Sequence, residues 1–410
     1  MINASIVTIG NEILSGRTVD TNAAFIGTEL LNIGIPVVSS FTVGDDLEAI
    51  FRALNLAAAE AELIIATGGL GPTDDDLTRQ AFAKFLGVNL ELHEDILEKI
   101  RNLFARRNMQ MPENNKIQAF IPAGAEALAN SGTAPGILAE SKGKLFIALP
   151  GVPIEAQRML ESVLDRLKNR AGTQAIETRR IKCFGAGEST ITEKLGDMMA
   201  RNRNPLINCT AHDGIITLHI IASAQDKNQA VEIADEDEKT IHEKLGELIY
   251  GTENQTLADV VAEKLSRLEK KIATAESCTG GLLSKMLTDI PGASEYFTHG
   301  WITYSNESKT EELLVLPELI GQYGAVSEQV AEAMARGARK KSRTDFAISI
   351  TGIAGPEGGT QEKPVGLVYI CIDSESCCQI KRCLFTSKRR FIRLRAAQTA
   401  LNMLRLKLKD

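Results

Sequence analysis

A serine stands where several features that activate a nucleophile coincide. Ser277 follows an apolar segment, Lys271–Ala275, that predicts a strand, and it precedes two glycines and a predicted helix, Leu282–Asp289. Its hydroxyl would therefore lie beside a helix N-terminus, whose free N–H groups bind phosphate or stabilise an oxyanion. Two alternatives stay open on spacing alone. Ser277 or Thr279 is only the helix N-cap, or the neighbouring Cys278 is the nucleophile.

A serine nucleophile needs a base, and the sequence offers a lysine. The chain has five histidines, only His299 lies in its last third, and it has no local arrangement with Ser277. A lysine serves as the base when burial lowers its pKa toward neutrality. Lys309 closes the segment that follows another predicted strand, Gly300–Tyr304, so it can reach the same sheet edge. The alternative is an exposed lysine at the start of a helix.

Carboxylates follow three predicted strands near the N-terminus. The strands are Ala4–Ile9, Pro36–Val43 and Leu63–Thr67, and the loops after them carry Glu12, Asp45, Asp74, Asp76, Gly68, Gly69 and Gly71. Loops after parallel strands gather at one sheet edge, so these residues are predicted to meet there. Oxygen ligands suit Mg²⁺ or a similar divalent metal, which can bridge carboxylates to phosphate. The alternative is that the aspartates only cap a helix, Leu77–Gly87.

The elements that position these residues predict an α/β protein of three domains. In residues 1–170, apolar strands alternate with helices such as Leu47–Glu60, which indicates a parallel sheet covered on both faces. Residues 171–252 predict a small α+β domain, in which Gly185–Glu188 favours a strand-to-helix turn over a phosphate cradle. Residues 253–410 return to the α/β pattern, with further strands and helices predicted at Asp345–Thr351, Gly366–Asp373, Glu328–Lys340 and Arg390–Leu408.

Composition narrows the function class. The 410 residues carry a net charge of −7 and only 5% aromatic side chains, so direct contact with nucleic acid is not expected. No stretch approaches the roughly 20 apolar residues of a membrane span, and the first residues lack the charged start of a signal peptide. Seven cysteines without paired zinc spacing suit reduced thiols, which predicts a cytoplasmic enzyme.

Motifs in the first domain resemble a known fold and a known family. The run TGGLGPTDDDLT (Thr67–Thr78), with PGVP (Pro150–Pro153), resembles the molybdopterin-binding fold of the MoaB, Mog and MoeA proteins. With GNEILSG (Gly10–Gly16), DTN (Asp20–Asn22) and NSGTAPG (Asn130–Gly136), it is similar to the N-terminal domain of the CinA family. The resemblance covers essentially the whole chain. For this domain it implies a metal-dependent ADP-ribose pyrophosphatase.

The resemblance also suggests roles for single residues. Asp45 and Asp76 take the positions of the functional aspartates of Mog-type proteins. Glu12 and Asp74 join them as metal ligands from their place on the sheet edge alone. Lys116 and the loop at 130–136 are candidates for contact with phosphate or ribose, although an ordinary surface lysine is an equally good interpretation of Lys116.

Motifs in the last domain resemble the C-terminal domain of the CinA family, which is similar to PncC, the stand-alone bacterial nicotinamide mononucleotide (NMN) deamidase. They are AESCTGG (Ala275–Gly281), TYSNESK (Thr303–Lys309), GAVSE (Gly324–Glu328), SITGIAGPEGG (Ser349–Gly359) and KPVG (Lys363–Gly366). The family's catalytic pair falls on Ser277 and Lys309, and no metal is implied. The candidate substrate contacts are Thr279, Gly280, Gly281, Tyr304, Gly352, Arg389 and Arg393.

The sequence therefore predicts a hydrolase with two activities on pyridine nucleotides and related compounds. One removes the amide of NMN, and the other splits ADP-ribose into AMP and ribose 5-phosphate. One alternative keeps only the deamidase, with a nucleotide-binding regulatory first domain. Another is a binding protein that serves competence or the response to DNA damage. The resemblance suggests a homodimer, and neither a membrane nor nucleic acid is an expected partner.

Overall fold

The computed structural model describes residues 2–171 and 175–408. The chain divides into two compact units, Met1–Glu177 with Ala222–Ile233, and Thr178–Ile221 with Ala234–Asp410. No helix in the described ranges is both long and apolar enough to cross a bilayer. All seven cysteines lie in those ranges and are free thiols.

The first unit contains a six-stranded sheet in the order β2-β1-β3-β8-β7-β6. Its strands are β1 (Ala4–Ile9), β2 (Val37–Val43), β3 (Leu63–Thr67), β6 (Glu126–Leu128), β7 (Gly136–Ser141) and β8 (Lys144–Leu149). β2, β1, β3 and β8 run parallel, as the apolar strands predicted, and β7 and β6 add an antiparallel edge.

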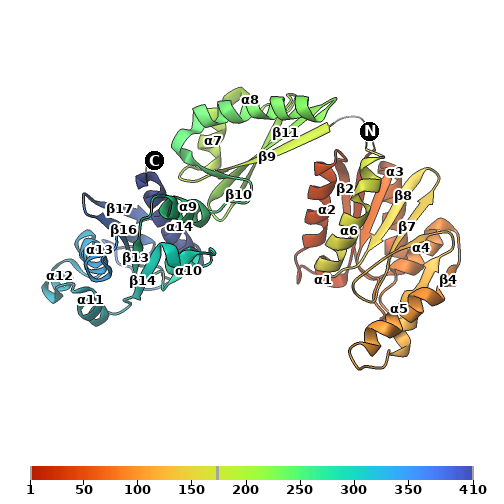
Figure 1. Ribbon diagram of the computed structural model, residues 1–410, viewed down its shortest axis with the longest axis horizontal. Coiled ribbons are helices and arrows are strands. Elements are labelled where there is room, and N and C mark those ends of the chain that lie inside the picture. The colour runs from red at the N-terminus through yellow and green to blue at the C-terminus, as the bar shows by residue number, and fades with distance from the viewer. Residues whose placement is uncertain (1, 172–174, 409–410) are drawn as a thin grey trace. The chain divides into compact units, whose positions relative to one another are not determined.

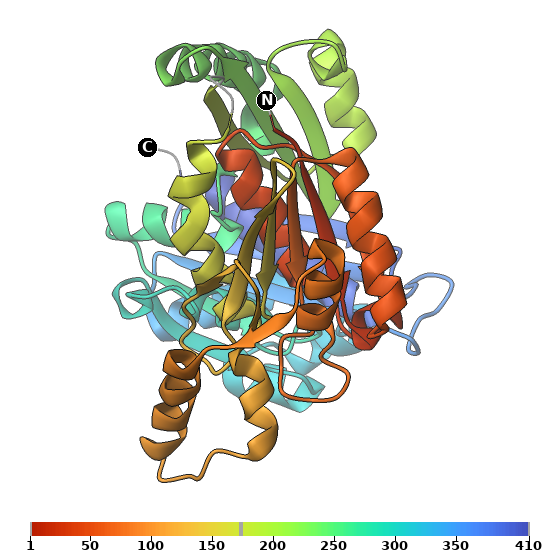
Figure 2. The same ribbon diagram turned by 90° about the vertical axis from the view of Figure 1, so that its right-hand side faces the viewer.

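Helices cover both faces of this sheet (Figure 1). One face packs against α3 (Leu47–Glu60), α4 (Thr78–Leu86) and α5 (Glu94–Ala105), and the other against α2 (Thr21–Asn32) and α6 (Pro153–Lys168). Figure 2 shows α3 and α6 on opposite sides of the strands. The remaining elements of the unit's first 170 residues are α1 (Asn11–Leu14), the 3₁₀ helix η1 (Glu113–Ala119) and a short antiparallel pair, β4 (Leu90–Leu92) and β5 (Phe120–Pro122).

The middle segment is an α+β module. Its sheet has the order β10-β11-β9-β12. The elements are β9 (Ala175–Cys183), α7 (Glu188–Leu195), η2 (Gly196–Met199), β10 (Leu206–His212), β11 (Ile215–Ala224), α8 (Lys227–Leu245), η3 (Gly246–Leu248) and β12 (Ile249–Thr252). Gly185–Gly187 links β9 to α7, which is the strand-to-helix turn that the sequence favoured.

The last segment is an α/β domain around a five-stranded sheet in the order β14-β13-β15-β16-β17. Its strands are β13 (Ile272–Glu276), β14 (Phe297–Ile302), β15 (Phe346–Gly352), β16 (Leu367–Ser374) and β17 (Cys378–Leu384). β14, β13 and β15 are parallel, and β16 pairs antiparallel with both of its neighbours, β15 and β17. The helices are α9 (Leu257–Arg267), α10 (Leu282–Thr288), η4 (Ala293–Glu295), α11 (Asn306–Leu313), α12 (Pro317–Tyr323), α13 (Glu328–Ser342) and α14 (Arg389–Lys407).

The packing of this domain brings the predicted serine and lysine to one sheet edge. Helices α9, α10 and α14 pack with one face of the sheet, and α13 packs with the other. β13 ends one residue before Ser277, and β14 ends shortly before α11, which carries Lys309. Both side chains therefore follow the carboxyl ends of neighbouring parallel strands, where α/β sheets bind ligands.

Candidate active sites

Ser277 lies in a tight turn between β13 and α10. Its N–H donates to the carbonyl of Ile350 on β15 (2.9 Å), and its own carbonyl accepts from the N–H of Gly280 (3.0 Å). Gly280 and Gly281 have φ values of 58° and 89°, in the left-handed region that favours glycine. The N-cap of α10 is Gly281, without a side-chain capping bond, so neither Ser277 nor Thr279 caps this helix. The serine hydroxyl is therefore available for another role.

Lys309 directs its amine at this hydroxyl. The Nζ atom lies 3.3 Å from Ser277 Oγ, and the lysine is only 1% exposed, so it is not a surface residue. The amine also donates to the carbonyls of Thr303 (2.9 Å), Tyr304 (3.3 Å) and Ser305 (3.3 Å), which fix its position. Burial lowers the pKa of Lys309 from its usual value, because the charged amine loses water. This is the environment that a lysine base requires.

The rival nucleophile, Cys278, is unsuited to that role. Its side chain is buried among the apolar residues of the domain. Burial raises the pKa of the thiol to about 12, so the thiol stays protonated near neutral pH. A cysteine attacks as the thiolate, and the structure therefore favours Ser277 over its neighbour.

A buried carboxylate that the sequence did not single out anchors the turn. Glu276 is fully buried. Its carboxylate accepts hydrogen bonds from the N–H groups of Leu283 (3.1 Å) and Ser284 (2.8 Å) and from the Ser284 hydroxyl (2.6 Å). An anion at a helix N-terminus satisfies N–H groups that would otherwise lack partners. The only sequence signal was its place directly before Ser277.

Arginines from α14 reach the loops around Ser277. Arg393 donates through Nε (3.2 Å) and Nη2 (2.5 Å) to the carbonyl of Thr279. Arg389 donates to the carbonyl of Gly355 (2.8 Å) and to the hydroxyl of Tyr304 (3.1 Å), whose side chain is exposed. The arginines thus join the turn after β13 to the loops after β14 and β15.

Two of the predicted substrate contacts, Thr279 and Gly352, lie in tightly packed surroundings. The Thr279 side chain is fully buried, and its hydroxyl has no hydrogen-bond partner within the described residues. Gly352 ends β15, where a Cβ atom would lie 2.7 Å from the Leu367 carbonyl and 2.7 Å from a Val368 methyl group. Gly352 therefore lets β16 pack closely against the end of β15.

The second candidate site is a cavity of about 420 Å³ at the carboxyl edge of the first sheet. The predicted residues that line it are Glu12, Asp45, Asp76, Gly68, Gly69 and Gly71, together with Thr133 and Ala134 of the loop at 130–136. Further lining residues, which the sequence did not single out, include Thr73, Asp75, Gln118 and Glu155. Asp74 and Lys116 are not among its lining residues, and Lys116 lies on η1.

Asp76 organises the glycine loop of this cavity. Its carboxylate accepts from the N–H groups of Gly71 (2.7 Å) and Thr73 (2.8 Å) and from the Thr73 hydroxyl (2.5 Å). The N-cap of α4 is Leu77, with no side-chain capping bond, so helix capping does not explain the aspartates. Gly68 also has to be glycine, because a Cβ atom there would lie 2.1 Å from the Ile9 carbonyl.

Arg79 holds the same loop through hydrogen bonds to its backbone. It is fully buried, and its guanidinium donates to the carbonyls of Leu70 (2.6 Å) and Gly71 (2.6 Å). Burial lowers the pKa of Arg79 to about 10, so the side chain is still charged at neutral pH. Its position after the PTDDDLT run was the only feature of the sequence that pointed to this residue.

Other polar contacts tie the loops of the first domain together. Asp45 accepts from the N–H of Asn11 (2.9 Å), which joins the loops after β2 and β1. Asn22, from the DTN motif, donates to the Thr67 hydroxyl (2.9 Å) and the Gly151 carbonyl (3.0 Å). Asn22 lines a smaller cavity, of about 110 Å³, that shares Glu12 with the larger one.

The carboxylates do not form a closed metal cage. Within the described ranges, no group of three or more His, Cys, Asp or Glu side chains could hold a metal ion. Mg²⁺, however, commonly binds through one or two carboxylates plus substrate phosphates. Glu12 and Asp45 line the same cavity and suit a metal held in that shared way. Asp76 is less suited, because both of its oxygens already accept hydrogen bonds from the glycine loop.

Three family models match successive parts of the chain. They are the probable molybdopterin binding domain over residues 5–169, the damage-inducible protein CinA KH domain over residues 178–251, and the CinA C-terminal domain over residues 254–408. The putative competence-damage inducible protein of Caldicellulosiruptor saccharolyticus is 42% identical over 403 residues, which cover 98% of each chain. The chain belongs to the CinA family.

Two further CinA proteins match, one over the whole chain and one over part of it. The CinA-like protein of Syntrophomonas wolfei is 43% identical over 414 residues and covers 100% of each chain. A crystal structure of the protein CinA from Thermoplasma acidophilum is 41% identical, and the match covers 40% of this chain and 97% of that one with a TM-score of 0.38. The serine turn lies in the CinA C-terminal domain, and the carboxylate cavity lies in the molybdopterin binding domain.

Proposed function

We propose that the C-terminal domain hydrolyses the carboxamide of NMN to nicotinate mononucleotide and ammonia. The observation that carries the proposal is the buried Lys309 amine 3.3 Å from the Ser277 hydroxyl. The neutral amine takes the hydroxyl proton, and the serine oxygen attacks the amide carbon. Ammonia leaves with a proton from the lysine, and water then hydrolyses the acyl-enzyme and releases the serine.

The surroundings of Ser277 support this chemistry. The N–H of Gly280 is used within the turn, but those of Thr279 and Gly281 have no acceptor in the described parts of the chain. They are therefore the donors that suit the oxyanion of the tetrahedral intermediate. Arg389 and Arg393 suit the phosphate of NMN, since a guanidinium gives forked hydrogen bonds to phosphate oxygens. Their present acceptors include uncharged carbonyls, with which a phosphate would compete effectively.

An ammonia-release assay tests the amidase directly. Purified protein is incubated with NMN, and Ser277→Ala is expected to abolish ammonia release because the nucleophilic oxygen is gone. Cys278→Ala is the matched control and should retain most of the activity, since its thiol is buried and protonated. Full activity of Ser277→Ala would refute the proposed nucleophile.

A second activity is proposed for the N-terminal domain, which is the metal-dependent hydrolysis of ADP-ribose to AMP and ribose 5-phosphate. The cavity that holds Glu12, Asp45 and the loop Gly68–Gly71 supports it. Glycine N–H groups suit the diphosphate, and Glu12 and Asp45 are the residues we propose to hold Mg²⁺ or a similar divalent metal. When bound, the metal would neutralise charge on the phosphate oxygens. A carboxylate of the cavity positions or deprotonates the attacking water.

Turnover of ADP-ribose with and without a chelator tests this second activity. The reaction should require a divalent ion and should disappear in Asp76→Ala, because the glycine loop loses its organising carboxylate. Turnover that a chelator leaves unchanged would overturn the metal requirement. If NMN is deamidated but ADP-ribose is never hydrolysed, the deamidase with a regulatory first domain becomes the better interpretation.

The binding-protein alternative predicts a tight complex with DNA, whereas the enzyme proposal predicts none. A mobility-shift assay at physiological salt should detect no tight DNA complex, given the net charge of −7. We also propose the homodimer on resemblance alone, and light scattering of the purified chain tests it.

A further inference from the structure

A second groove lies next to the carboxylate cavity of the first domain. It has a volume of about 400 Å³ and is bordered by α5, β6 and the loop that follows β6. Residues of one helix face, Ile96, Ile100 and Leu103, line one wall. Six consecutive residues, Ala125–Asn130, line the other. The volume is in the range of small-molecule sites.

The walls of this groove suit a flat, uncharged ring. Ile96, Ile100 and Leu103 are spaced by four and three residues, which places their side chains on one side of α5. Ala125 and Ala127 are small and partly buried, and they pack against the same hydrophobic cluster as Ile96 and Ile100. Small side chains opposite branched ones leave a slot with apolar sides.

The edge of the sheet adds hydrogen-bonding groups to the slot. β6 is the last strand of the sheet and pairs only with β7 among the described residues. In an antiparallel edge strand, part of the backbone N–H and C=O groups point away from the partner strand. A purine ring carries donors and acceptors along its edge and can pair with such groups.

The groove and the carboxylate cavity share a wall. Thr133 lines both of them. The neighbouring Asn130 lines the groove and donates to the carboxylate of Glu155 (2.6 Å), which lines the cavity, and to the carbonyl of Ala134 (2.7 Å). A ligand with two connected parts can therefore occupy both at once.

The charges of the groove and of the cavity indicate which of them suits a phosphate and which suits an uncharged base. Besides His93, the titratable side chains that line the groove are Asp95, Lys99 and Glu126. Lys99 lies 3.5 Å from Asp95, and Glu126 pairs with Arg166 (2.8 Å) outside the lining, so two carboxylates and one amine face the groove and do not favour a phosphate. The glycine loop of the neighbouring cavity offers backbone N–H groups instead. Phosphate fits the cavity, and an uncharged base fits the groove.

We propose that the groove between α5 and β6 is the purine subsite of the N-terminal domain. It would hold the adenine of a nucleoside diphosphate whose phosphates lie over the loop Gly68–Gly71. This inference rests on the proposed hydrolysis of ADP-ribose and deepens it, because it names where the base binds.

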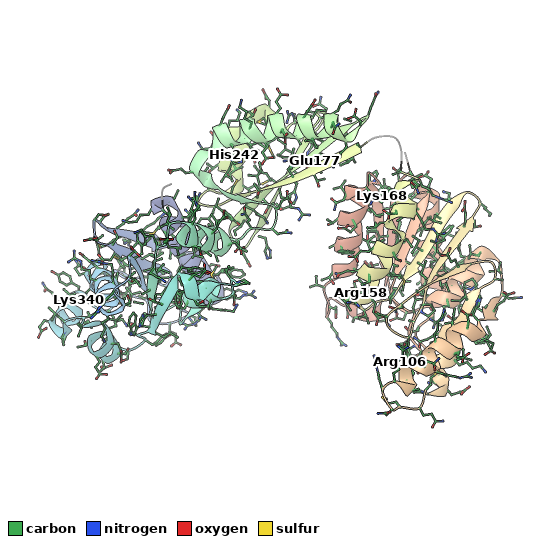
Figure 3. All side chains as sticks on the ribbon, viewed as in Figure 1. Arg106, Arg158, Lys168, Glu177, His242 and Lys340 are labelled. Atoms are coloured by element: carbon green, nitrogen blue, oxygen red, sulfur yellow. The ribbon has the colours of Figure 1, made fainter. Side chains whose placement is uncertain are left out.

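Binding of AMP to the full chain, measured by calorimetry, tests the subsite. Ala127→Phe fills the slot and should weaken AMP binding on the order of tenfold or more, because the base loses its apolar contacts. Ala129→Phe does the same from an exposed lining residue, where the larger side chain does not disturb the core. Ala105→Phe is the matched control, because Ala105 is exposed and ends α5 beside Arg106, which Figure 3 labels. Ribose 5-phosphate should bind all four proteins alike.

The outcomes separate the subsite from the activity. Loss of AMP binding in both groove variants, with no ADP-ribose turnover in the wild type, would support the subsite and refute the pyrophosphatase. Normal turnover with an unchanged KM in both groove variants would refute the subsite and leave the pyrophosphatase standing. Failure of the wild type to bind AMP would also overturn the subsite. Thermal unfolding of each variant identifies any that does not fold, and Ala129→Phe then decides the result.

Discussion

The environment of a single amine determines how the proposed amidase responds to pH. Lys309 must be neutral to accept a proton, and burial lowers its pKa from the usual 10.5. A lowered pKa means that the amine loses its proton at a lower pH, so a larger fraction is neutral near pH 7. The neutral base is thus more abundant than it would be for a surface lysine at the same pH.

The pH profile of NMN deamidation should follow this titration. We expect kcat/KM to rise with pH, with a midpoint below 10.5, because the neutral form of Lys309 is the active one. Lys309→Arg should be inactive throughout, since a guanidinium does not deprotonate in this range. Initial rates of ammonia release measure both. A rate that is constant from about pH 6 to about pH 10 would contradict the lysine base.

Thiol chemistry provides a second check at the residue scale. Cys377 is exposed, whereas Cys278 is buried with its pKa raised to about 12. Iodoacetamide at about pH 8 should therefore alkylate Cys377 first and leave ammonia release intact. Peptide mass spectrometry locates the label. Inactivation that coincides with labelling of Cys278 would favour the thiol as the nucleophile.

Spacing alone could propose the serine and the lysine but could not choose between serine and cysteine, and only the family resemblance favoured Ser277. Strand, glycines and helix placed both Ser277 and Cys278 at the same turn, and the choice depends on which side chain faces the core. The role of Glu276 was not predicted, because it too depends on the direction of the side chain. Its role depends on N–H groups of Leu283 and Ser284, and a sequence does not show that the chain turns back on the carboxylate.

At the scale of elements, the ends of strands set the geometry of the C-terminal site. Gly352 lets β16 approach the end of β15 closely. The neighbouring loop supplies the Gly355 carbonyl that Arg389 contacts. The close packing of two strands therefore contributes to the position of a phosphate-binding candidate.

Replacing Gly352 by alanine should destabilise the C-terminal domain by about 1–3 kcal/mol, because the added carbon meets the Leu367 carbonyl and Val368. Gly321→Ala, on α12, is the control: nothing lies within 4 Å of its added carbon. It should be neutral or gain up to about 1 kcal/mol. Urea unfolding followed by the fluorescence of Trp301, the single tryptophan, measures both variants. Equal stability of the two would contradict the packing role.

The glycine loop of the N-terminal domain gives a prediction of the same kind. Asp76→Asn keeps the size of the side chain but replaces one acceptor oxygen by a donor, so Gly71 and Thr73 cannot both be held. ADP-ribose turnover should fall at least about tenfold, since a displaced loop misaligns the substrate. Asp74→Asn should change little, because Asp74 does not line the cavity. Equal losses in both variants would show that the acidic run acts only through its charge.

Strands with continuous apolar character were predicted most accurately. Among the edge strands, β2 was also predicted, within one residue, but others were not. β1 and β3 begin and end where the sequence predicted, because they are buried on both faces. β14 begins at Phe297 rather than Gly300, since it is an edge strand with exposed residues and no clear pattern. β6 and β7 were not predicted, and their loop was interpreted only as a motif, which is why the groove beside them gave no sequence signal.

At the scale of the whole molecule, the two candidate sites belong to different compact units. Each site is built from side chains of its own unit, so neither set of contacts depends on the other. The family models also separate the two sites, with one in the first matched domain and the other in the last.

Substitution in one site should therefore leave the other activity intact. Ser277→Ala should hydrolyse ADP-ribose at the wild-type rate, and Asp76→Asn should deamidate NMN at the wild-type rate, because each site is built from side chains of its own unit and independent sites act additively. Both assays on both purified variants measure this. A loss of the two activities together in either variant would reveal coupling between the units.

Enclosure of the Lys309 amine has a consequence for how hydrogen moves during turnover. The amine is 1% exposed and is bounded by three carbonyls and one hydroxyl. Because the amine is shielded from bulk solvent, we expect it to exchange hydrogen with the serine and with the reactants bound beside the serine. In the proposed reaction, the departing ammonia removes that hydrogen and the incoming water replaces it. Each catalytic cycle would then return the amine to its starting protonation state with protons supplied by the reactants.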